Sequence, residues 1–507
     1  MLKKTRRVLA LVLCLALCLG LAACGQKEAA GGSKILHLAK SFAYPSLDAH
    51  QEYYGWYTSI YGITETLYRL DDNSAFQPCL AESATVDESG LVWTVTLKDG
   101  VCFSNGNPLK AEMVIRNIQR LAERNNRFAY LGEFQYAAVD DRTLTITTDV
   151  IFPTMLNSLA TPELAMLDLD GTTDFTNAPV ATGPFVVKSF VPEGTVEVEK
   201  NTKYWGGDVA LDGAVFHYMQ DDDSKLMAMQ NGEILGYDSV TAAAMEIYRG
   251  APDKYTLTTI PATRLQFYIL NENTLDDDLR AAVNLTVDCE AIAAFLNGTV
   301  SAAVGPFNTN APYGKVTKPA PDPAKAQQLI EKAGYTRNAN GFYEKDGQEL
   351  CLNICYYAAR SLDSLALLMQ EQLKAVGVNS VLTCEEDPDA TYIATGDFDI
   401  ALYCMIADKD GDPFYFIDST LRDGSYYDCG GFDDATCEAL ISELKYETDT
   451  QKRAELANQI VQIAIDDNAF GYVGLFNKNT VMANGVSGIS ENCPFDFYCI
   501  TAKTTMK

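Results

Sequence analysis

Three aspartates in one short segment have a spacing that could bind a metal ion. Asp408, Asp410 and Asp412 match the start of a calcium loop, in which alternate residues supply oxygen ligands. The pattern then fails, because position six is Pro413 instead of glycine and position twelve is Ser419 instead of glutamate. We therefore expect no calcium site here and assign no metal ligands.

Other reactive patterns are also missing from the sequence. Its three histidines are not clustered, and Cys351 and Cys355 have a spacing typical of neither a zinc nor a redox site. The motifs H-E-x-x-H, G-x-S-x-G and G-x-x-x-x-G-K do not occur. We assign no catalytic residue and no cofactor. Two of the many acidic side chains could still serve a hydrolase, so a secreted hydrolase stays open as the alternative from another class.

The N-terminus has the features of an export signal. Basic residues precede an apolar run over residues 8–23, which is 16 residues long and shorter than the ~20 that span a bilayer. The run ends in Leu-Ala-Ala-Cys, which resembles a bacterial lipobox. That resemblance implies a signal peptide over 1–23, lipid on Cys24, and a lipidated tether over 24–33 that holds the protein to the membrane. An ordinary cleaved signal is the alternative.

Composition limits the possible functions. The formal net charge of −29 disfavours nucleic acid and anionic lipid surfaces as partners, and removing the basic signal makes the chain more acidic. With 47% hydrophobic and 21% charged residues the chain is globular, and its length predicts two or three domains. We interpret most of the cysteines, such as Cys102, Cys351, Cys355 and Cys404, as small buried hydrophobic residues.

The periodicity of apolar residues predicts the elements that must position any site. Strands and helices alternate from about 323 to 406, which indicates α/β layering. Residues 91–97 alternate like a strand, whereas 109–124 and 450–466 have helical spacing. An aromatic-rich helix is predicted over 53–68.

Several sequence blocks together resemble the extracytoplasmic peptide- and nickel-binding proteins of bacterial ABC importers, solute-binding protein family 5. They occur in the family's order and span most of the mature chain. The blocks are 80–83 with LVWTVTLKDGVCFSNGNPLKAEMV at 91–114, PVATGPFVVKSF at 179–190 with KNTKYWGG at 200–207, the helix pair at 276–298, DPAKAQQLIEKAGY at 322–335, and GDFDIALYCMIADKDGDPF at 396–414.

The resemblance implies an α/β fold, a two-lobed clamshell like the periplasmic binding proteins (type II, cluster C), with an extra inserted α+β domain. On that pattern lobe I uses 34–75, 180–265 and 485–507. The inserted domain is 76–179, and lobe II is 266–484. Ligand exchange would follow closure of the two lobes.

The resemblance also implies where a ligand binds. Peptide binders of the family hold the α-ammonium with an aspartate that Asp408 matches, and dipeptide binders carry an arginine in the loop of Arg360 for the carboxylate. Guanidinium suits that role because it can form two parallel hydrogen bonds. The alternatives are a turn aspartate that caps a strand, and a surface arginine paired with Asp363.

Three tyrosines lie in the N-terminal region that faces the cleft in relatives. Tyr44, Tyr53 and Tyr54 could line a pocket for ligand side chains. Packing in the core or on the surface is the alternative for each of them.

The nickel-binding branch implies a different ligand. Arg127 matches an arginine that meets the carboxylates of the metal chelate in that branch, but it could also be an exposed helix-end residue. The branch's metal-binding histidine falls at Cys404, and its second arginine falls near Thr161. Nickel favours imidazole nitrogen, so these differences count against a nickel chelate.

These observations predict an extracytoplasmic, lipid-anchored substrate-binding protein that captures short peptides and is not an enzyme. Its expected partners are the ABC permease subunits with their ATPases, and a monomer is expected. A nickel-chelate or other small-solute binding protein of the same family is the alternative.

Overall fold

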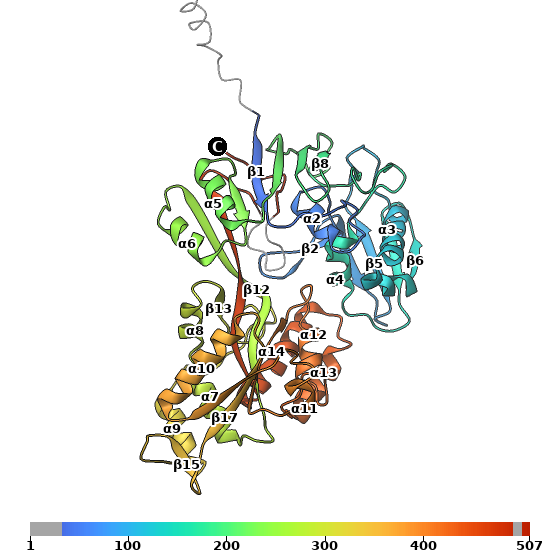
Figure 1. The fold of residues 1–507 in the computed structure, drawn as a ribbon. Coiled ribbons are helices and arrows are strands. Elements are labelled where there is room, and N and C mark those ends of the chain that lie inside the picture. The colour runs from blue at the N-terminus through green and yellow to red at the C-terminus, as the bar shows by residue number, and fades with distance from the viewer. Residues whose placement is uncertain (1–32, 490–498) are drawn as a thin grey trace, which may run out of the picture.

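The structure is a computed structural model that describes residues 33–489 and 499–507. The expected signal peptide, Cys24 and nearly all of the tether lie outside the described residues. Figure 1 shows two bodies, one above the other, connected by two long strands. We call the body that contains β1 (Ile35–Lys40) the upper body and the body that contains β17 (Cys351–Tyr356) the lower body. Helices with both the length and the apolar content to cross a membrane are absent from the described residues.

One sheet of eleven strands runs through both bodies. Its upper strands, with β1, are β8 (Phe185–Phe190), β9 (Val196–Lys200), β10 (Gly213–Tyr218) and β11 (Gly236–Asp238). Its lower strands, with β17, are β13 (Val300–Ala302), β18 (Asn379–Cys384) and β19 (Ile400–Ile406). The strands that join the bodies are β12 (Tyr255–Leu270) and β20 (Phe470–Ala483).

The two joining strands change partners where they pass between the bodies. Residues 255–261 of β12 pair with β20 on the upper side, where β20 also pairs with β11. Residues 264–270 pair with β19 on the lower side. The register shifts between Pro261 and Leu265. Proline has no N–H to give to a ladder and is placed in strands at edges and bulges, so the irregularity falls where the bodies meet.

Part of the upper body has its own sheet and core. Four antiparallel strands pack against α3, whose buried Val114, Ile118 and Leu121 recur every three or four residues. The predicted strand and helix of this region are confirmed. The elements are β4 (Ala81–Val86), β5 (Val92–Leu97), β6 (Gln135–Ala138), β7 (Thr143–Thr147), α3 (Ala111–Arg124), η1 (Asn126–Glu133), α4 (Met155–Ala160) and η2 (Pro162–Leu164).

Helices cover both faces of the sheet in the lower body. One apolar core joins the sheet to α7 (Asp277–Thr286), α8 (Cys289–Phe295), α9 (Pro323–Lys332) and α10 (Leu362–Val376). The other joins it to α11 (Tyr392–Thr395), α12 (Phe414–Thr420), α13 (Ala435–Leu444) and α14 (Thr450–Asp466). Three layers result, as the alternation of strands and helices predicted. A small distal sheet contains β14 (Thr336–Arg337), β15 (Tyr343–Lys345) and β16 (Gln348–Glu349).

The helix predicted over 53–68 is wrong in its second half. The helix α2 covers only Tyr54–Ile60, and Gly62 then adopts a left-handed backbone with φ of 67°. The chain goes on to β2 (Tyr68–Leu70), which forms a hairpin with β3 (Phe76–Pro78). Glycine adopts positive φ without the steric cost that a side chain brings, so it ends the helix early. The remaining upper helices are α5 (Asp222–Asn231) and α6 (Ala242–Arg249).

Cysteines behave only partly as predicted. The described cysteines other than Cys499 are free thiols. Cys355 and Cys404 are buried, as expected, but Cys351 is exposed and Cys102 is half-buried. Cys351 is the first residue of β17 and lies on the same face of the strand as Cys355.

Candidate ligand-binding site

The two bodies touch through the loop that follows β19. Asn157 of α4 donates a hydrogen bond to the carbonyl of Asp410 at 2.6 Å, and a Cβ atom added to Gly411 would lie 2.8 Å from the Leu70 side chain. The strands β17 and β19 are parallel, so their carboxyl ends lie at one edge of the sheet, and this edge faces the upper body. Ligands of open α/β sheets bind outside the carboxyl ends of the strands. We call this edge of the lower body, together with the loops that follow β17 and β19, the lower edge.

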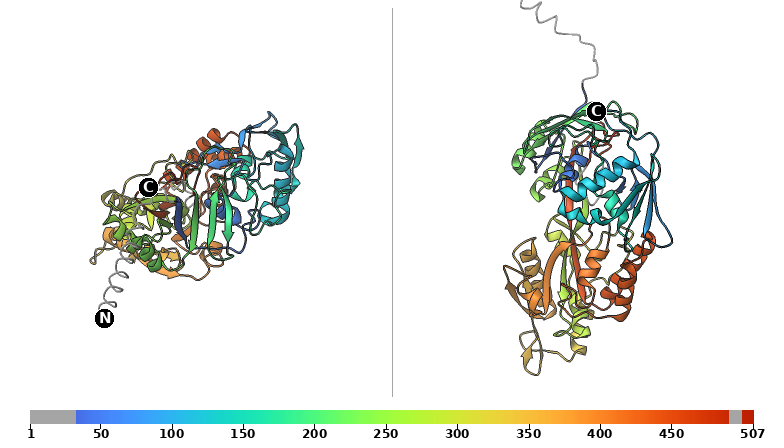
Figure 2. Two further views of the ribbon diagram at one scale, coloured as in Figure 1. Left: turned by 90° about the horizontal axis from the view of Figure 1, so that it is seen from above. Right: turned by 90° about the vertical axis from the view of Figure 1, so that its right-hand side faces the viewer.

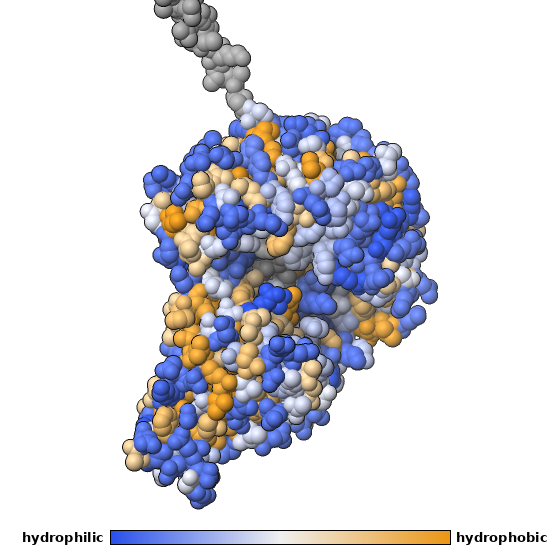
Figure 3. Space-filling model, viewed as in Figure 1, coloured by the Kyte–Doolittle hydropathy of each residue, from blue (hydrophilic) through white to orange (hydrophobic). Residues whose placement is uncertain are grey.

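The space between the bodies is hollowed. Figure 3 shows a recess between them, with hydrophilic side chains on both of its walls. A cavity of about 650 Å³ opens beside the contact at Asp410 and is lined mostly by the upper body. Its wall includes Glu65, Arg69, Asp71, Thr161 and Tyr204.

Asp408 lies buried in the lower edge with no cation beside it. Its side chain is 3% exposed and accepts hydrogen bonds from the Tyr313 hydroxyl at 2.6 Å and from the Gly411 N–H at 3.1 Å. Burial raises the pKa of its carboxyl to about 8, and the two nearby aspartates add to that rise. Among the described residues it forms no ion pair, whereas Asp412 in the same loop pairs with Arg453 at 2.5 Å. Asp408 is therefore a buried carboxyl that lacks a cationic partner.

Arg360 lies at the same edge, in the loop after β17. Its side chain is exposed, and its backbone has a left-handed φ of 55°, followed by 56° at Ser361. Two such residues in succession are strained, and strain of this kind occurs where surrounding contacts hold a functional site. The buried Gln266 of β12 supplies such a contact, because its Nε2 donates to the Arg360 carbonyl at 2.6 Å. The ion pair with Asp363 that the sequence left open is not formed in this structure.

A second arginine, which the sequence reasoning missed, lies close to the first. Arg264 faces Ile406 across the ladder of β12 and β19, next to the pair of Gln266 and Cys404. Burial raises the pKa of the Cys404 thiol, and the guanidinium groups of Arg264 and Arg360 both oppose that rise. Both arginines therefore lie near Gln266 and Cys404 at the lower edge.

Arg127 lies on the facing wall, in the upper body. Its Nη1 is 2.9 Å from the Glu163 carboxylate, and its guanidinium lies 4.1 Å from the centre of the Tyr53 ring. The side chain is 40% exposed, while Glu163 is buried and also accepts a hydrogen bond from Thr161 at 2.8 Å. Arg127 is thus exposed and lies just after the end of α3, as the alternative expected. It is held by an internal anion and an aromatic face.

The three predicted tyrosines also lie in the upper body. The centre of the Tyr44 ring lies 3.7 Å from the centre of the Tyr57 ring and 5.6 Å from that of Tyr54. The Tyr53 ring lies against the guanidinium of Arg127. Burial raises the pKa of the Tyr44 and Tyr54 hydroxyls. The structure therefore gathers the predicted aromatic residues with Arg127 on the upper body, and Asp408 with Arg360 on the lower edge.

Histidines lie away from the lower edge. His37 and His217 stack on one another and share a hydrogen bond of 2.9 Å, both from strands of the upper body. His50 is buried, bonds to the Ala165 carbonyl, and has a pKa lowered to about 4 by burial. Within the described residues no group of three or more histidine, cysteine or acidic side chains could hold a metal ion.

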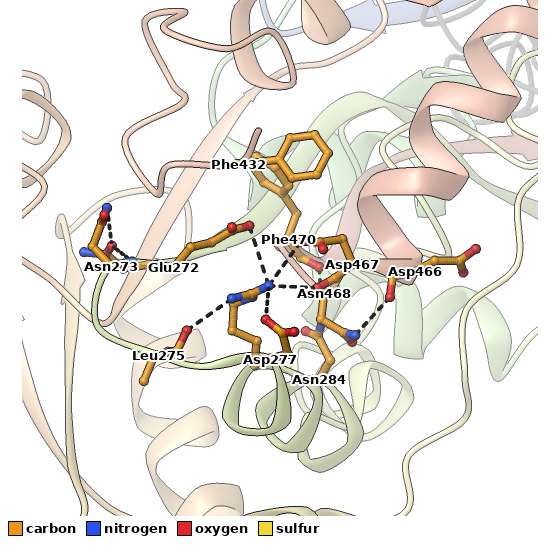
Figure 4. Close-up of polar contacts among 12 residues, drawn as sticks. Glu272, Asn273, Leu275, Asp277, Asn284, Phe432, Asp466, Asp467, Asn468 and Phe470 are labelled. Atoms are coloured by element: carbon orange, nitrogen blue, oxygen red, sulfur yellow. Dashed lines mark hydrogen bonds and ion pairs between the residues drawn. The ribbon is translucent and has the colours of Figure 1, made fainter. Parts of the chain in front are cut away.

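A charge cluster around the buried Arg280, at the opposite end of the lower body, has a different character. The guanidinium of Arg280 lies 3.1 Å from Asp277, 3.2 Å from Asp467 and 3.8 Å from Glu272 (Figure 4). Burial and the neighbouring carboxylates raise the pKa of Glu272 to about 7. The cluster joins the loop after β12 to the start of α7 and the end of α14, so it stabilises the fold and does not face the upper body.

Two features were out of reach of the sequence reasoning. Tyr313 comes from a segment without regular structure, 95 residues before its partner Asp408. Arg264 lies in a strand that the sequence analysis did not predict. Its only sequence signal is a basic residue in an apolar strand-like run just after Pro261.

The fold defines a class: a two-lobed α/β solute-binding protein. Residues 75–428 match the bacterial extracellular solute-binding proteins, family 5 (middle region), and the chain belongs to that family. This confirms the resemblance and the fold predicted from the sequence. Proteins of this family serve ABC importers as substrate-binding components and are not enzymes.

Three relatives illustrate the range of ligands. The nickel-binding protein NikA of Staphylococcus aureus is 22% identical over 448 residues, 88% of this chain and 89% of the relative. The glutathione-binding protein GsiB of Pectobacterium atrosepticum is 29% identical over 291 residues, 54% of this chain and 56% of the relative. The crystal structure of a nickel ABC transporter protein from Bacillus halodurans superposes with a TM-score of 0.85 at 26% identity, covering 94% of this chain and all of the other.

Proposed function

We propose that this protein captures short peptides and delivers them to the permease of an ABC importer. Asp408 binds the ligand's ammonium group and Arg360 its carboxylate, while Tyr44, Tyr53 and Tyr54 line space for ligand side chains. No bond is made or broken. The observation that carries the proposal is the buried carboxyl of Asp408, which has hydrogen-bond donors but no cation among the described residues.

An ammonium group is the complement that such a carboxyl requires. An isolated buried charge costs several kcal/mol, and an approaching cation removes that cost. The glutathione-binding relatives support a peptide, because glutathione is a tripeptide that carries an ammonium group and two carboxylates. Closure of the bodies about β12 and β20 then favours the liganded state only by the ligand's differential affinity for the closed form.

A nickel chelate is the second candidate, favoured by the two nickel-related proteins described above and by Arg127. A chelate would bring its own nitrogen and oxygen donors, with Arg127 on its carboxylates. Cys404 replaces the imidazole expected of that branch, and Arg127 is already paired with Glu163.

Calorimetric titration of the mature protein separates the candidates. We expect Ala-Ala and similar dipeptides to bind, and nickel with free histidine to produce no heat of binding. Binding of the nickel mixture alone would overturn the proposal. Chromatography of the recovered peptide tests the hydrolase alternative, because a binding protein returns it intact.

We also propose that lipid on Cys24 anchors the protein, as a monomer, to the outer face of the cell membrane. The support is the Leu-Ala-Ala-Cys segment after the apolar run. Replacing Cys24 with serine should move the protein from the membrane fraction to the soluble fraction. Unchanged membrane association would count against the anchor.

A further inference from the structure

Arg264 and Arg360 are two of the five described arginines that have no ion pair with a carboxylate, and both lie at the lower edge. In a chain with 68 acidic and 39 basic residues, a guanidinium finds a carboxylate easily. Most arginines of the described residues do so: Arg116, Arg120, Arg127, Arg142, Arg249, Arg280, Arg422 and Arg453. Two unpaired guanidinium groups side by side repel one another, so their proximity calls for an anionic ligand.

The surrounding structure fixes both arginines at the lower edge. Arg264 extends from β12 beside the end of β19, and Gln266, two residues further on, holds the backbone of Arg360. Gln266 is fully buried, so this connection is rigid. The positive charges of the two guanidinium groups both act to lower the pKa of the Cys404 thiol and of the Tyr357 hydroxyl. The arginines therefore form one preorganised cationic corner.

The opposite charge is placed separately. Asp408 bonds to Tyr313, which belongs to the core beneath α12–α14, whereas Cys404 belongs to the core beneath α7–α10. The single carboxyl and the two arginines thus lie toward different faces of the same sheet. A ligand lying along the lower edge would meet one negative group at one end and two positive groups at the other.

We infer that Arg264 is a specificity-determining residue that binds a second carboxylate, so that the preferred ligands are peptides ending in aspartate or glutamate. This inference rests on the proposed function. Arg360 takes the α-carboxylate, and the carboxylate nearest to it in a peptide is the side chain of a C-terminal acidic residue. The strongly negative protein repels acidic solutes at long range, so their capture depends on this local pair of cations.

The test compares two dipeptides of nearly equal shape, Ala-Glu and Ala-Gln, by calorimetry on the full mature protein. We expect wild type to bind Ala-Glu at least ~10-fold more tightly, because a guanidinium–carboxylate contact is charge-assisted. Arg264→Gln should reduce that preference to less than ~3-fold while leaving Ala-Gln within ~3-fold of its wild-type affinity. Arg264→Lys keeps the charge and should keep part of the preference.

Arg337→Gln is the control, since it removes another arginine of the lower body that has no carboxylate partner, in the distal β14. It should leave the preference unchanged, and a thermal melt checks that each variant is folded. Equal wild-type affinities, or a preference that persists in Arg264→Gln, would overturn the role of Arg264 while the peptide function stands. Failure of both dipeptides to bind wild type would overturn the peptide function as well.

Discussion

The two walls of the cleft use the same residue types in opposite ways. On the upper body Arg127 and the buried Glu163 satisfy one another at 2.9 Å, with Tyr53 over the guanidinium. On the lower edge Asp408 has no cation and Arg360 has no carboxylate among the described residues. Charges that pair within one wall stabilise that wall, whereas unpaired charges remain available to a ligand.

The acids of the two walls show the same difference. Burial raises the pKa of both carboxyls, but the pKa of Glu163 is pulled back by Arg127. At Asp408 it is hydrogen bonds from Tyr313 and Gly411 that oppose the rise, and its pKa still reaches about 8. The lower edge therefore holds a carboxyl that lacks a cation, and substitutions on each wall can show whether the ligand binds there.

The largest effect is expected at Asp408. Replacing Asp408 with asparagine keeps the shape and the hydrogen bond from Tyr313 but removes the charge, and we expect dipeptide affinity to fall by ~100-fold or more. Calorimetry measures the loss, and Asp433→Asn, which changes an exposed aspartate of the same body, is the control. Wild-type affinity in Asp408→Asn would remove the ammonium site from the lower edge.

Binding should also depend on pH through Asp408. In the free protein its carboxyl is protonated below about pH 8, and a bound ammonium favours the ionised form. Binding at pH 6 should therefore release about one proton, and affinity should rise with pH toward 8 by up to ~10-fold per pH unit. Titrations in buffers of different ionisation enthalpy count the protons. A pH-independent affinity between 6 and 8 would show that Asp408 is not the contact.

Arg360 should have the next largest effect on binding. Because its side chain is exposed in the unliganded protein, Arg360→Gln should leave the melting temperature nearly unchanged. Dipeptide affinity should fall by ~10- to 30-fold through loss of the carboxylate contact. A dipeptide amide, which lacks that carboxylate, should bind wild type and variant alike. A similar loss for both ligands would mean that Arg360 acts on the fold instead.

Replacing Arg127 should have the opposite effect to replacing Arg360: the protein should lose stability but keep its affinity for dipeptides. Arg127→Gln leaves Glu163 buried with only Thr161 as a side-chain partner, so the free energy of unfolding should fall by about 1–3 kcal/mol. Dipeptide affinity should stay within ~3-fold of wild type, because the upper wall only flanks the ligand. Chemical denaturation and calorimetry measure the two quantities. A large loss of binding with unchanged stability would make the upper wall the primary site and favour the chelate.

Sequence patterns predicted what local periodicity specifies. The helices at α10 and α14 follow from apolar residues repeating every three or four positions, and Gly377 ends the first with a φ of 93°. The joining strand β12 was not predicted, because Pro261 interrupts it and its strand partners lie far away in the chain.

The binding site likewise combines a position that could be predicted from the sequence with contacts that only the folded chain creates. The position of Asp408 came from the family resemblance, but its burial depends on Tyr313, which only the folded chain brings to it. Arg264 and Arg360 are almost one hundred residues apart, and it is the pairing of β12 with β19 and the bond from Gln266 that place them together. Long-range pairing of this kind leaves no local pattern in a single sequence.

The smallest effect is expected at the distal cluster, where three carboxylates share Arg280 (Figure 4). The folded-state pKa of Glu272 is about 7, above the value of an unfolded glutamate, so its contribution favours the folded state at low pH and is lost as pH rises toward 7. Glu272→Gln should therefore raise the free energy of unfolding by about 1 kcal/mol or less at pH 8 and change it little at pH 4.5. Thermal melts at both pH values measure this, with Glu290→Gln on the exposed side of α8 as the control. Destabilisation at pH 8 would mean that the ionised Glu272 is a net stabilising partner of Arg280. Glu272 would then differ from Asp408, which has no cation beside it, even though the pKa of both carboxyls is raised.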